Sequence, residues 1–168
     1  ISAQRMSSLA NFLAQMPKSY VVLTTLSAAS QRVPARSTVE SAVFRASVKS
    51  QVDEQALRAF LARMGYAQTP TVMEAGDYSI RGGIIDIFPP SLSKPIRLDF
   101  FGDTLDGIRQ FDPATQRTVK SLEKVELSPV SEAILDEASI RRFRQKYRIE
   151  FGAAGTDDTL FEAISAGR

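Results

Sequence analysis

The chain contains no histidine, no cysteine and no tryptophan among its 168 residues. Without histidine and cysteine, it has no Ser-His-Asp triad, no thiolate nucleophile and no disulfide bond. The same two absences remove the ligands of a Cys/His zinc site. Several classes of enzyme are therefore excluded before any motif is considered.

Long hydrophobic runs are also missing. The longest apolar stretches, such as residues 20–23, span only a few residues, whereas a membrane-spanning helix needs about 20. No basic segment followed by an apolar one opens the chain, as it would in a secretory signal. We therefore expect a soluble, cytoplasmic protein.

Neither sign of charge dominates. The 21 basic and 19 acidic residues leave a net charge of +2, far below the charge density of a dedicated nucleic-acid arm. The length and the 43% hydrophobic content suit one domain, or one domain and part of another, with a real core. Because the first residue is Ile1 and the last apparent helix has no closing strand, we expect a piece of a longer polypeptide.

The N-terminal part has helical and then strand-like spacing. Leu9, Phe12, Leu13 and Met16 follow the i, i+3, i+4, i+7 pattern of an amphipathic helix, which Pro17 would end. The near-continuous apolar segment after it predicts a short buried strand over residues 20–25, followed by a loop over 31–38.

The next segment combines a strand with a well-marked helix. Residues 43–48 alternate as in a strand covered on one face. Asp53 is placed to cap a helix, with Val52 before it as a hydrophobic staple for Leu57. Gly65 supplies the left-handed residue that ends a helix. The apolar face of this helix comprises Leu57, Phe60, Leu61 and Met64.

From residue 71 the hydrophobic period changes from 3.6 to 2, with Gly, Pro and Asp between the runs. Such a pattern predicts a meander of short antiparallel strands with one face on a helix and one face open to water. The helix that begins after Asp53 is the expected cover, so the fold class is α+β. The expected strands are 78–81, 84–88, 96–101, 105–111 and, more weakly, 120–127.

The tail returns to helical spacing, with a second short helix from about 158 to 165. The apolar stripe of the first tail helix comprises Ile140, Phe143, Tyr147 and Phe151. The five basic residues of this helix lie outside the stripe and spread over more than half the circumference. They therefore indicate a solvated helix face, with direct DNA binding as the alternative. The five are Arg141, Arg142, Arg144, Lys146 and Arg148.

Two further features of the sequence resemble sites of chemistry. The pair Gly82-Gly83 precedes a strand rather than a helix, so it predicts a tight turn and not a phosphate-binding loop. The spacing of the aspartates fits no calcium loop and indicates turns and solvated faces rather than a metal or acid-base cluster. These aspartates are Asp86, Asp99, Asp103, Asp106 and Asp112.

Alternation turns Ser79 and Arg81 outward on one strand, and Arg97 and Asp99 outward on another. Arginine forms bidentate pairs with carboxylates, so exposed arginines beside apolar side chains are typical of a protein-docking surface. A merely solvated face explains the same pattern equally well.

Three blocks in order carry a resemblance to a known family: residues 76–89 (GDYSIRGGIIDIFP), 97–103 (RLDFFGD) and 108–112 (IRQFD). They resemble the second domain of the nucleotide-excision-repair protein UvrB, in the version found near the N-terminus of bacterial transcription-repair coupling factors (Mfd). The resemblance divides the chain into residues 1–42, the end of a helicase-like α/β domain, 43–121, the UvrB-type second domain, and 122–168, the start of a following segment.

The resemblance implies a docking module for the excinuclease subunit UvrA, with no catalysis, cofactor or metal of its own. The family's contact residues correspond to Arg81, Arg97 and Asp99, and a surface aromatic such as Phe101 would supply a dry centre. In such proteins RNA polymerase and DNA are bound through other domains, and the parent protein is an ATP-dependent DNA translocase whose ATPase lies outside this chain.

UvrB carries further arginines where this chain has Gln68 and Ser79, and this departure favours the coupling-factor version. Two alternatives stay open. The chain would be a fragment of a UvrB helicase if an ATP site lay upstream of Ile1, or a DNA-binding module if the basic tail helix were the functional part.

Overall fold

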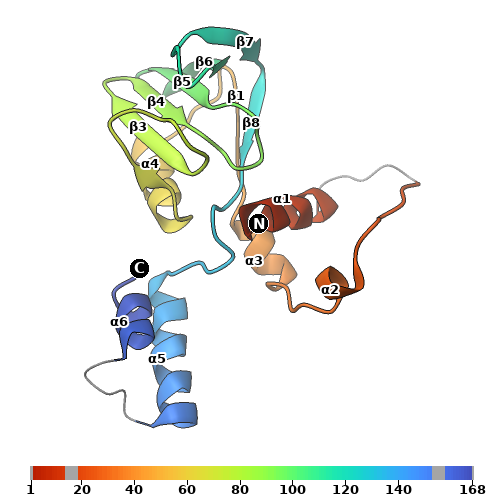
Figure 1. The fold of residues 1–168 in the computed structure, drawn as a ribbon. Helices are drawn as coiled ribbons and strands as arrows, with labels where there is room; N and C mark the ends of the chain where they lie inside the picture. The colour runs from red at the N-terminus through yellow and green to blue at the C-terminus, as the bar shows by residue number, and fades with distance from the viewer. Residues whose placement is uncertain (1, 14–18, 153–157, 168) are drawn as a thin grey trace. The chain divides into compact units, whose positions relative to one another are not determined.

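The computed structural model describes residues 2–13, 19–152 and 158–167 (Figure 1). The chain divides into two compact units, Ile1–Glu132 and Ala133–Arg168. In the described part of the chain, no helix is both long and apolar enough to cross a membrane.

The first unit is organised around a sheet of six strands in the order β2-β3-β4-β5-β6-β7. Neighbouring strands are antiparallel except β2 and β3, which are parallel. The α+β class and the meander predicted from the sequence are confirmed, while the two-residue β2 was not anticipated. The strands are β2 (Ala67–Gln68), β3 (Asp77–Arg81), β4 (Ile84–Ile87), β5 (Ile96–Phe101), β6 (Thr104–Phe111) and β7 (Thr118–Leu122).

The turn between β3 and β4 depends on its two glycines. Gly82 has φ +60°, and a residue with a side chain would be strained in this conformation. A Cβ atom on Gly83 would lie 2.9 Å from the carbonyl oxygen of Phe100. Gly83 O also accepts a hydrogen bond from Phe100 N at 2.8 Å. The pair therefore forms the predicted tight turn and lets β5 approach the hairpin.

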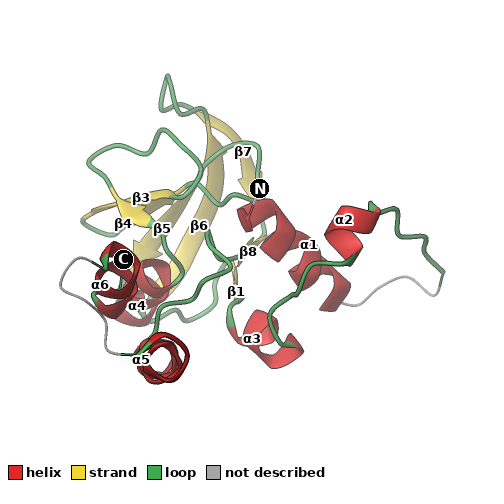
Figure 2. Ribbon diagram, turned by 60° about the horizontal axis from the view of Figure 1, so that its bottom comes forward, coloured by secondary structure: helices red, strands yellow, loops and turns green. Residues whose placement is uncertain are grey.

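Helix α4 (Glu54–Arg63) covers one face of the sheet (Figure 2). Asp53 caps it as predicted, because its side chain accepts hydrogen bonds from Gln55 N and Ala56 N. Gly65 follows the helix with φ +83°. The predicted apolar face is buried and meets the fully buried inner residues of the strands. The helix contributes Leu57, Phe60, Leu61 and Met64, and the strands Ile85, Ile87, Ile96, Leu98, Leu105 and Ile108.

A separate ribbon joins β1 (Phe44–Ser47) to β8 (Lys124–Leu127) in antiparallel register. The sequence predicted one strand over 120–127, and this is wrong: β7 and β8 belong to different sheets. Apolar residues alternate in β8, where Val125 and Leu127 are buried, but not in the largely exposed β7, and the hydrogen-bonding partners of both strands lie in distant segments. The alternation predicted for 43–48 agrees with the burial pattern of β1.

The first unit also contains α1 (Ser2–Leu13), α2 (Leu26–Ala29) and α3 (Arg36–Ser41). A small apolar cluster of Met6, Ala10 and Val39 joins α1 to α3. Of the helix face predicted for the start of the chain, Leu9 and Leu13 pack against this cluster, whereas Phe12 is 44% exposed. Met16 and Pro17 lie outside the described residues.

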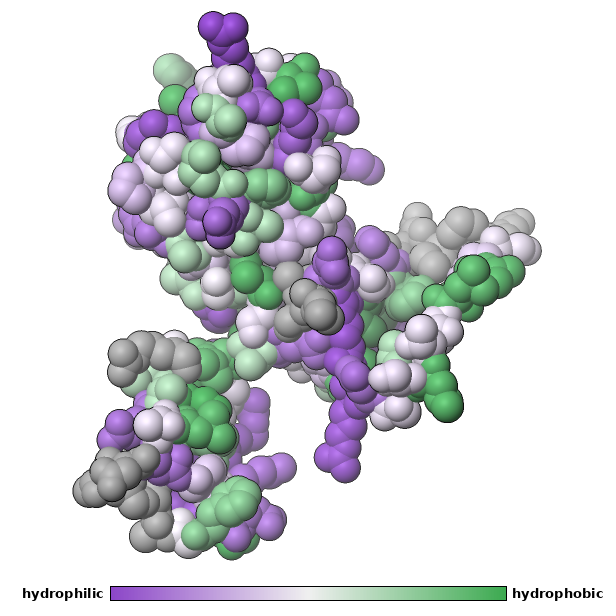
Figure 3. Space-filling view, in the orientation of Figure 1, coloured by the Kyte–Doolittle hydropathy of each residue, from purple (hydrophilic) through white to green (hydrophobic). Residues whose placement is uncertain are grey.

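The buried strand predicted over 20–25 is wrong. Val21 and Leu23 are 87% and 93% exposed, and Figure 3 shows hydrophobic surface along this segment. The segment is extended, but a strand needs a partner for its main chain, and none of the described residues pairs with it. The predicted loop over 31–38 is also too long, since α3 begins at Arg36.

The second unit consists of the two predicted tail helices, α5 (Glu137–Phe151) and α6 (Thr159–Ser165). The rings of Phe143, Tyr147 and Phe161 meet between them, with centroids 5.2 to 6.0 Å apart. Asp158 caps α6 by accepting from Phe161 N and also accepts a hydrogen bond from the Tyr147 hydroxyl. Both helices therefore contribute to one aromatic cluster.

We expect replacement of Asp53 by alanine to lower the free energy of unfolding by about 1 kcal/mol, because two N–H groups at the start of α4 lose their acceptor. Urea denaturation measures this change. Asp53→Asn is the matched control, since asparagine retains a side-chain oxygen and should lose only a fraction of that stability. Equal losses in the two variants would contradict the capping role.

Candidate docking surface

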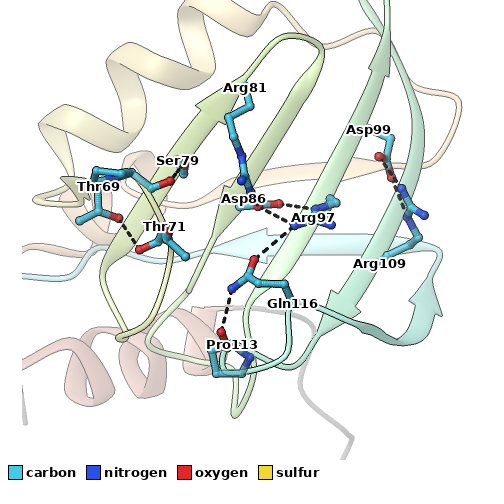
Figure 4. Close-up of polar contacts among 11 residues, drawn as sticks. Thr69, Thr71, Ser79, Arg81, Asp86, Arg97, Asp99, Arg109, Pro113 and Gln116 are labelled. Carbon is cyan, nitrogen blue, oxygen red and sulfur yellow. Dashed lines mark hydrogen bonds and ion pairs between the residues drawn. The ribbon is translucent and has the colours of Figure 1, made fainter.

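The register of the strands places a row of polar side chains on the face of the sheet away from α4. Ser79 lies opposite Asp86, Asp86 opposite Arg97, and Arg97 opposite Arg109. Directly opposed residues share a face, so these side chains and those two positions along each strand form one surface. We call Arg81, Asp86, Arg97, Asp99 and Arg109 the charged face (Figure 4).

Asp86 is the buried centre of the charged face. Its carboxylate, 1% exposed, accepts from Arg97 through both oxygens, Nε to Oδ1 at 2.7 Å and Nη2 to Oδ2 at 2.8 Å. Oδ2 also accepts from Nη2 of Arg81 at 2.7 Å. The expectation that Asp86 serves a turn or a solvated face is wrong, because β4 is covered by β3 and β5 on its two sides and the carboxylate lies between two guanidinium groups.

The two arginines that bind Asp86 differ in exposure. The Arg97 side chain is 19% exposed and its guanidinium carbon lies 4.8 Å from the centroid of the Phe111 ring. The hydrogen bond to Asp86 raises the pKa of Arg97 further above its ordinary value. Arg81 is 53% exposed. The Arg97 side chain is thus largely covered by the protein, whereas the Arg81 side chain is half exposed to solvent.

Asp99 pairs with Arg109 rather than with Arg97. The two residues form a bidentate pair, with Nε to Oδ2 at 2.9 Å and Nη2 to Oδ1 at 2.6 Å. Arg97 is not available to Asp99, because it already meets Asp86 directly across the strands. The charged face therefore contains three arginines and two aspartates, with a net charge of +1.

The structure places Ser79 differently from the prediction that it points to solvent. Ser79 is 3% exposed and its hydroxyl donates to the carbonyl oxygen of Pro70 at 3.2 Å. A pocket of about 460 Å³ lies beside it, lined by residues 68–70 and 79–81. Gln68 and Ser79 thus both line the pocket that Arg81 borders.

Phe101 ends β5 and is 83% exposed. Its ring lies at the surface, directly before the turn formed by Gly102 and Asp103. Large exposed aromatic residues are over-represented in protein interfaces. Its placement is compatible with the contact role expected from the resemblance.

A turn after β6 brings an unpredicted residue to Arg97. Gln116, with φ +59°, donates from Nε2 to Pro113 O at 2.7 Å and directs its Oε1 towards Arg97 Nη2, 3.5 Å away. Asp112 holds the turn by accepting from Thr115 N at 3.0 Å. The sequence gave no signal for this contact, because Gln116 lies at the end of the turn between β6 and β7, 19 positions from Arg97.

Other charged groups lie away from the charged face or in a different unit. Asp106 is paired with Lys49, and Asp103 is exposed in a turn, as predicted for both. The basic residues of α5 are exposed, and Arg144 donates to Ser165 O at 2.9 Å. A larger pocket of about 680 Å³ lies between β1, β8 and the start of α4. No group of metal-ligating side chains occurs among the described residues.

The charged face thus presents arginines that are held in place by carboxylates, with a net positive charge. Among known families, the UvrB interaction domain matches residues 44–132. That match covers more than half of the chain, and the chain belongs to this family.

Curated relatives are transcription-repair-coupling factors. The protein from Myxococcus xanthus is 45% identical over 93 residues, which are 55% of this chain and 8% of the relative. The protein from Escherichia coli (strain K12) is 37% identical over 117 residues, 70% of this chain and 10% of the relative. That from Rickettsia bellii is 32% identical over 120 residues, 71% of this chain and 11% of the relative. The chain thus corresponds to a small part of these relatives.

We expect Asp86→Ala to lower the free energy of unfolding by about 3 kcal/mol, because it leaves Arg97 and Arg81 facing each other without an acceptor. Asp99→Ala is the control, since its pair with Arg109 is partly exposed and should contribute at most about 1 kcal/mol. Urea denaturation of both variants compares them. Similar losses of unfolding free energy in the two variants would contradict a larger contribution of the buried Asp86.

Acid should disturb the turn that carries Gln116. Hydrogen bonds from the Thr115 backbone and then from Lys94 lower the pKa of Asp112 below the ordinary value of an aspartate. Its stabilising contribution is therefore fully present above that ordinary pKa and is lost as the pH falls through the lowered one. An NMR titration of the Asp112 carboxyl measures this, and in Lys94→Ala its midpoint should move upward. An unchanged midpoint in the variant would contradict the role of Lys94.

Proposed function

We propose that this chain is a docking module for the excinuclease subunit UvrA and is itself non-catalytic. In transcription-coupled nucleotide excision repair it would bring UvrA to RNA polymerase stalled at a lesion, while polymerase and DNA are bound by other parts of a longer protein. Such a module needs no cofactor and no metal. A repair role of this kind implies a cytoplasmic location.

The observation that carries the proposal is the state of Arg81. Its guanidinium is fixed by one hydrogen bond to the buried Asp86 and yet is half exposed. A fixed arginine loses little side-chain entropy when a partner binds, so more of the interaction energy appears as affinity. The family match adds support, because its name describes an interaction domain.

Each site residue expected from the sequence has a role in this proposal. Arg81 pairs with an acidic side chain of UvrA, and the less exposed Arg97 adds positive potential beneath it. Asp99 fixes Arg109, which extends the surface, and so acts through that arginine rather than through Arg97. Phe101 supplies apolar area at the edge.

Two other functions lead to different expectations. A fragment of a UvrB helicase would also bind UvrA, but its full gene would encode a phosphate-binding loop and a DNA-clamping hairpin. A DNA-binding module that uses α5 would bind duplex DNA with an affinity that falls steeply with salt, by a log-log slope of about −0.9 per phosphate contacted.

We expect Arg81→Ala to weaken binding to UvrA by about 2 to 5 kcal/mol, because a carboxylate of the partner is left unpaired in the interface. Isothermal titration calorimetry with purified UvrA measures this, with circular dichroism to check folding. Arg45→Ala is the matched control, since Arg45 is also half exposed and paired with an acid, Glu126, but belongs to the β1–β8 ribbon. Unchanged affinity of a folded Arg81→Ala variant would refute the assignment, and binding to DNA without binding to UvrA would favour α5.

A further inference from the structure

The edge of the six-stranded sheet beside Arg81 is covered only in part. β2 pairs with β3 at Asp77 and Tyr78, and the last main-chain hydrogen bond between the two segments runs from Thr69 N to Tyr78 O at 2.8 Å. Pro70 follows, and proline has no N–H group with which to continue a strand. Because β3 continues to Arg81, it outruns the strand that covers its edge.

Ile80 directs its main-chain polar groups to this open edge. Arg81 and Ile84 flank the two-residue turn, and the pair that closes such a hairpin exchanges hydrogen bonds. Bonded and non-bonded pairs alternate along an antiparallel ladder, so the N–H and C=O of Ile80, opposite Ile85, point away from β4. Among the described residues, no main-chain group on the β2 side bonds to them.

The open edge borders the pocket of about 460 Å³. Arg81 is the only charged residue among the six that line this pocket. In the described structure the only hydrogen bond of its guanidinium is that from Nη2 to Asp86, and a guanidinium carries five N–H donors. The pocket therefore offers a partner one main-chain donor, one main-chain acceptor and a fixed positive charge.

We propose that an extended acidic segment of the docking partner adds to the sheet at this pocket, as a short strand whose main chain pairs with Ile80 and whose carboxylate binds Arg81. The inference rests on the proposed docking function and adds the conformation of the partner. An unpaired strand edge is a template for a further strand, and strand addition takes its affinity from main-chain bonds and its specificity from alternate side chains.

The alternation of side chains also fixes the spacing in the partner. A partner residue directly opposite Ile80 shares the face of Ile80, whereas its immediate neighbours share the face of Arg81. The acidic residue of the partner therefore stands one position away from the residue that pairs with Ile80. A basic or uncharged residue at that place would leave the Arg81 donors without an acceptor.

Amide hydrogen exchange tests this directly. The chain, in complex with UvrA, is exposed to deuterium oxide for different times, exchange is quenched, and the amides are resolved by NMR after dissociation. We expect the Ile80 amide to exchange at least about tenfold more slowly in the complex than in the free chain, because a hydrogen-bonded amide exchanges only through opening. The amides of β7, at the opposite edge of the sheet, are the control and should not change.

The outcomes separate this inference from the docking function. Binding that is lost in Arg81→Ala, together with unchanged exchange at Ile80, would overturn strand addition and leave docking intact. No binding to UvrA at all would overturn both. If the Ile80 amide of the chain alone exchanged more slowly as the concentration of the chain was raised, a second copy would occupy the edge. That result would also overturn the proposal.

Discussion

A carboxylate buried in a sheet requires positive charge close by, and this requirement organises the exposed side of the six-stranded sheet. Asp86 would be costly to bury alone. Its position between Arg81 and Arg97 compensates that cost and, at the same time, fixes the direction of both guanidinium groups. The register of β3, β4 and β5 follows from the same contact, since a slip of one residue would turn the aspartate to the side of α4. Stability and the orientation of the surface thus depend on one interaction.

Local signals predicted the helix α4 and most strands. Asp53 and Gly65 mark the ends of α4 by chemistry that operates within a few residues, and the alternation of apolar side chains marks the strands. Hydrophobic patterns failed at two places: the near-continuous apolar segment at residues 20–25 is exposed, and the single strand predicted over 120–127 is divided between β7 and β8. Whether an extended segment is paired, and with which strand, depends on distant parts of the chain, so short-range patterns do not decide it.

The candidate surface was predictable to a similar extent. Outward alternation selected Arg81, Arg97 and Asp99, and the resemblance selected the same three residues. Neither the alternation nor the resemblance revealed that Arg97 is largely covered, that Asp99 binds Arg109, or that Asp86 lies between the arginines. These facts are properties of cross-strand pairing. Asp86 lies within an apolar run, Ile84 to Ile87, where a single acid can be judged only once its neighbours on both sides are known.

The antiparallel ribbon gives this domain a feature of a different kind. Phe44, where the chain enters the sheet domain, is paired with Leu127, where it leaves. Entry and exit points that adjoin are those at which one folded unit can be inserted into another without separating the flanking parts of the host. The segment from β1 to β8 thus begins and ends at one place, so the chain that precedes it and the chain that follows it adjoin.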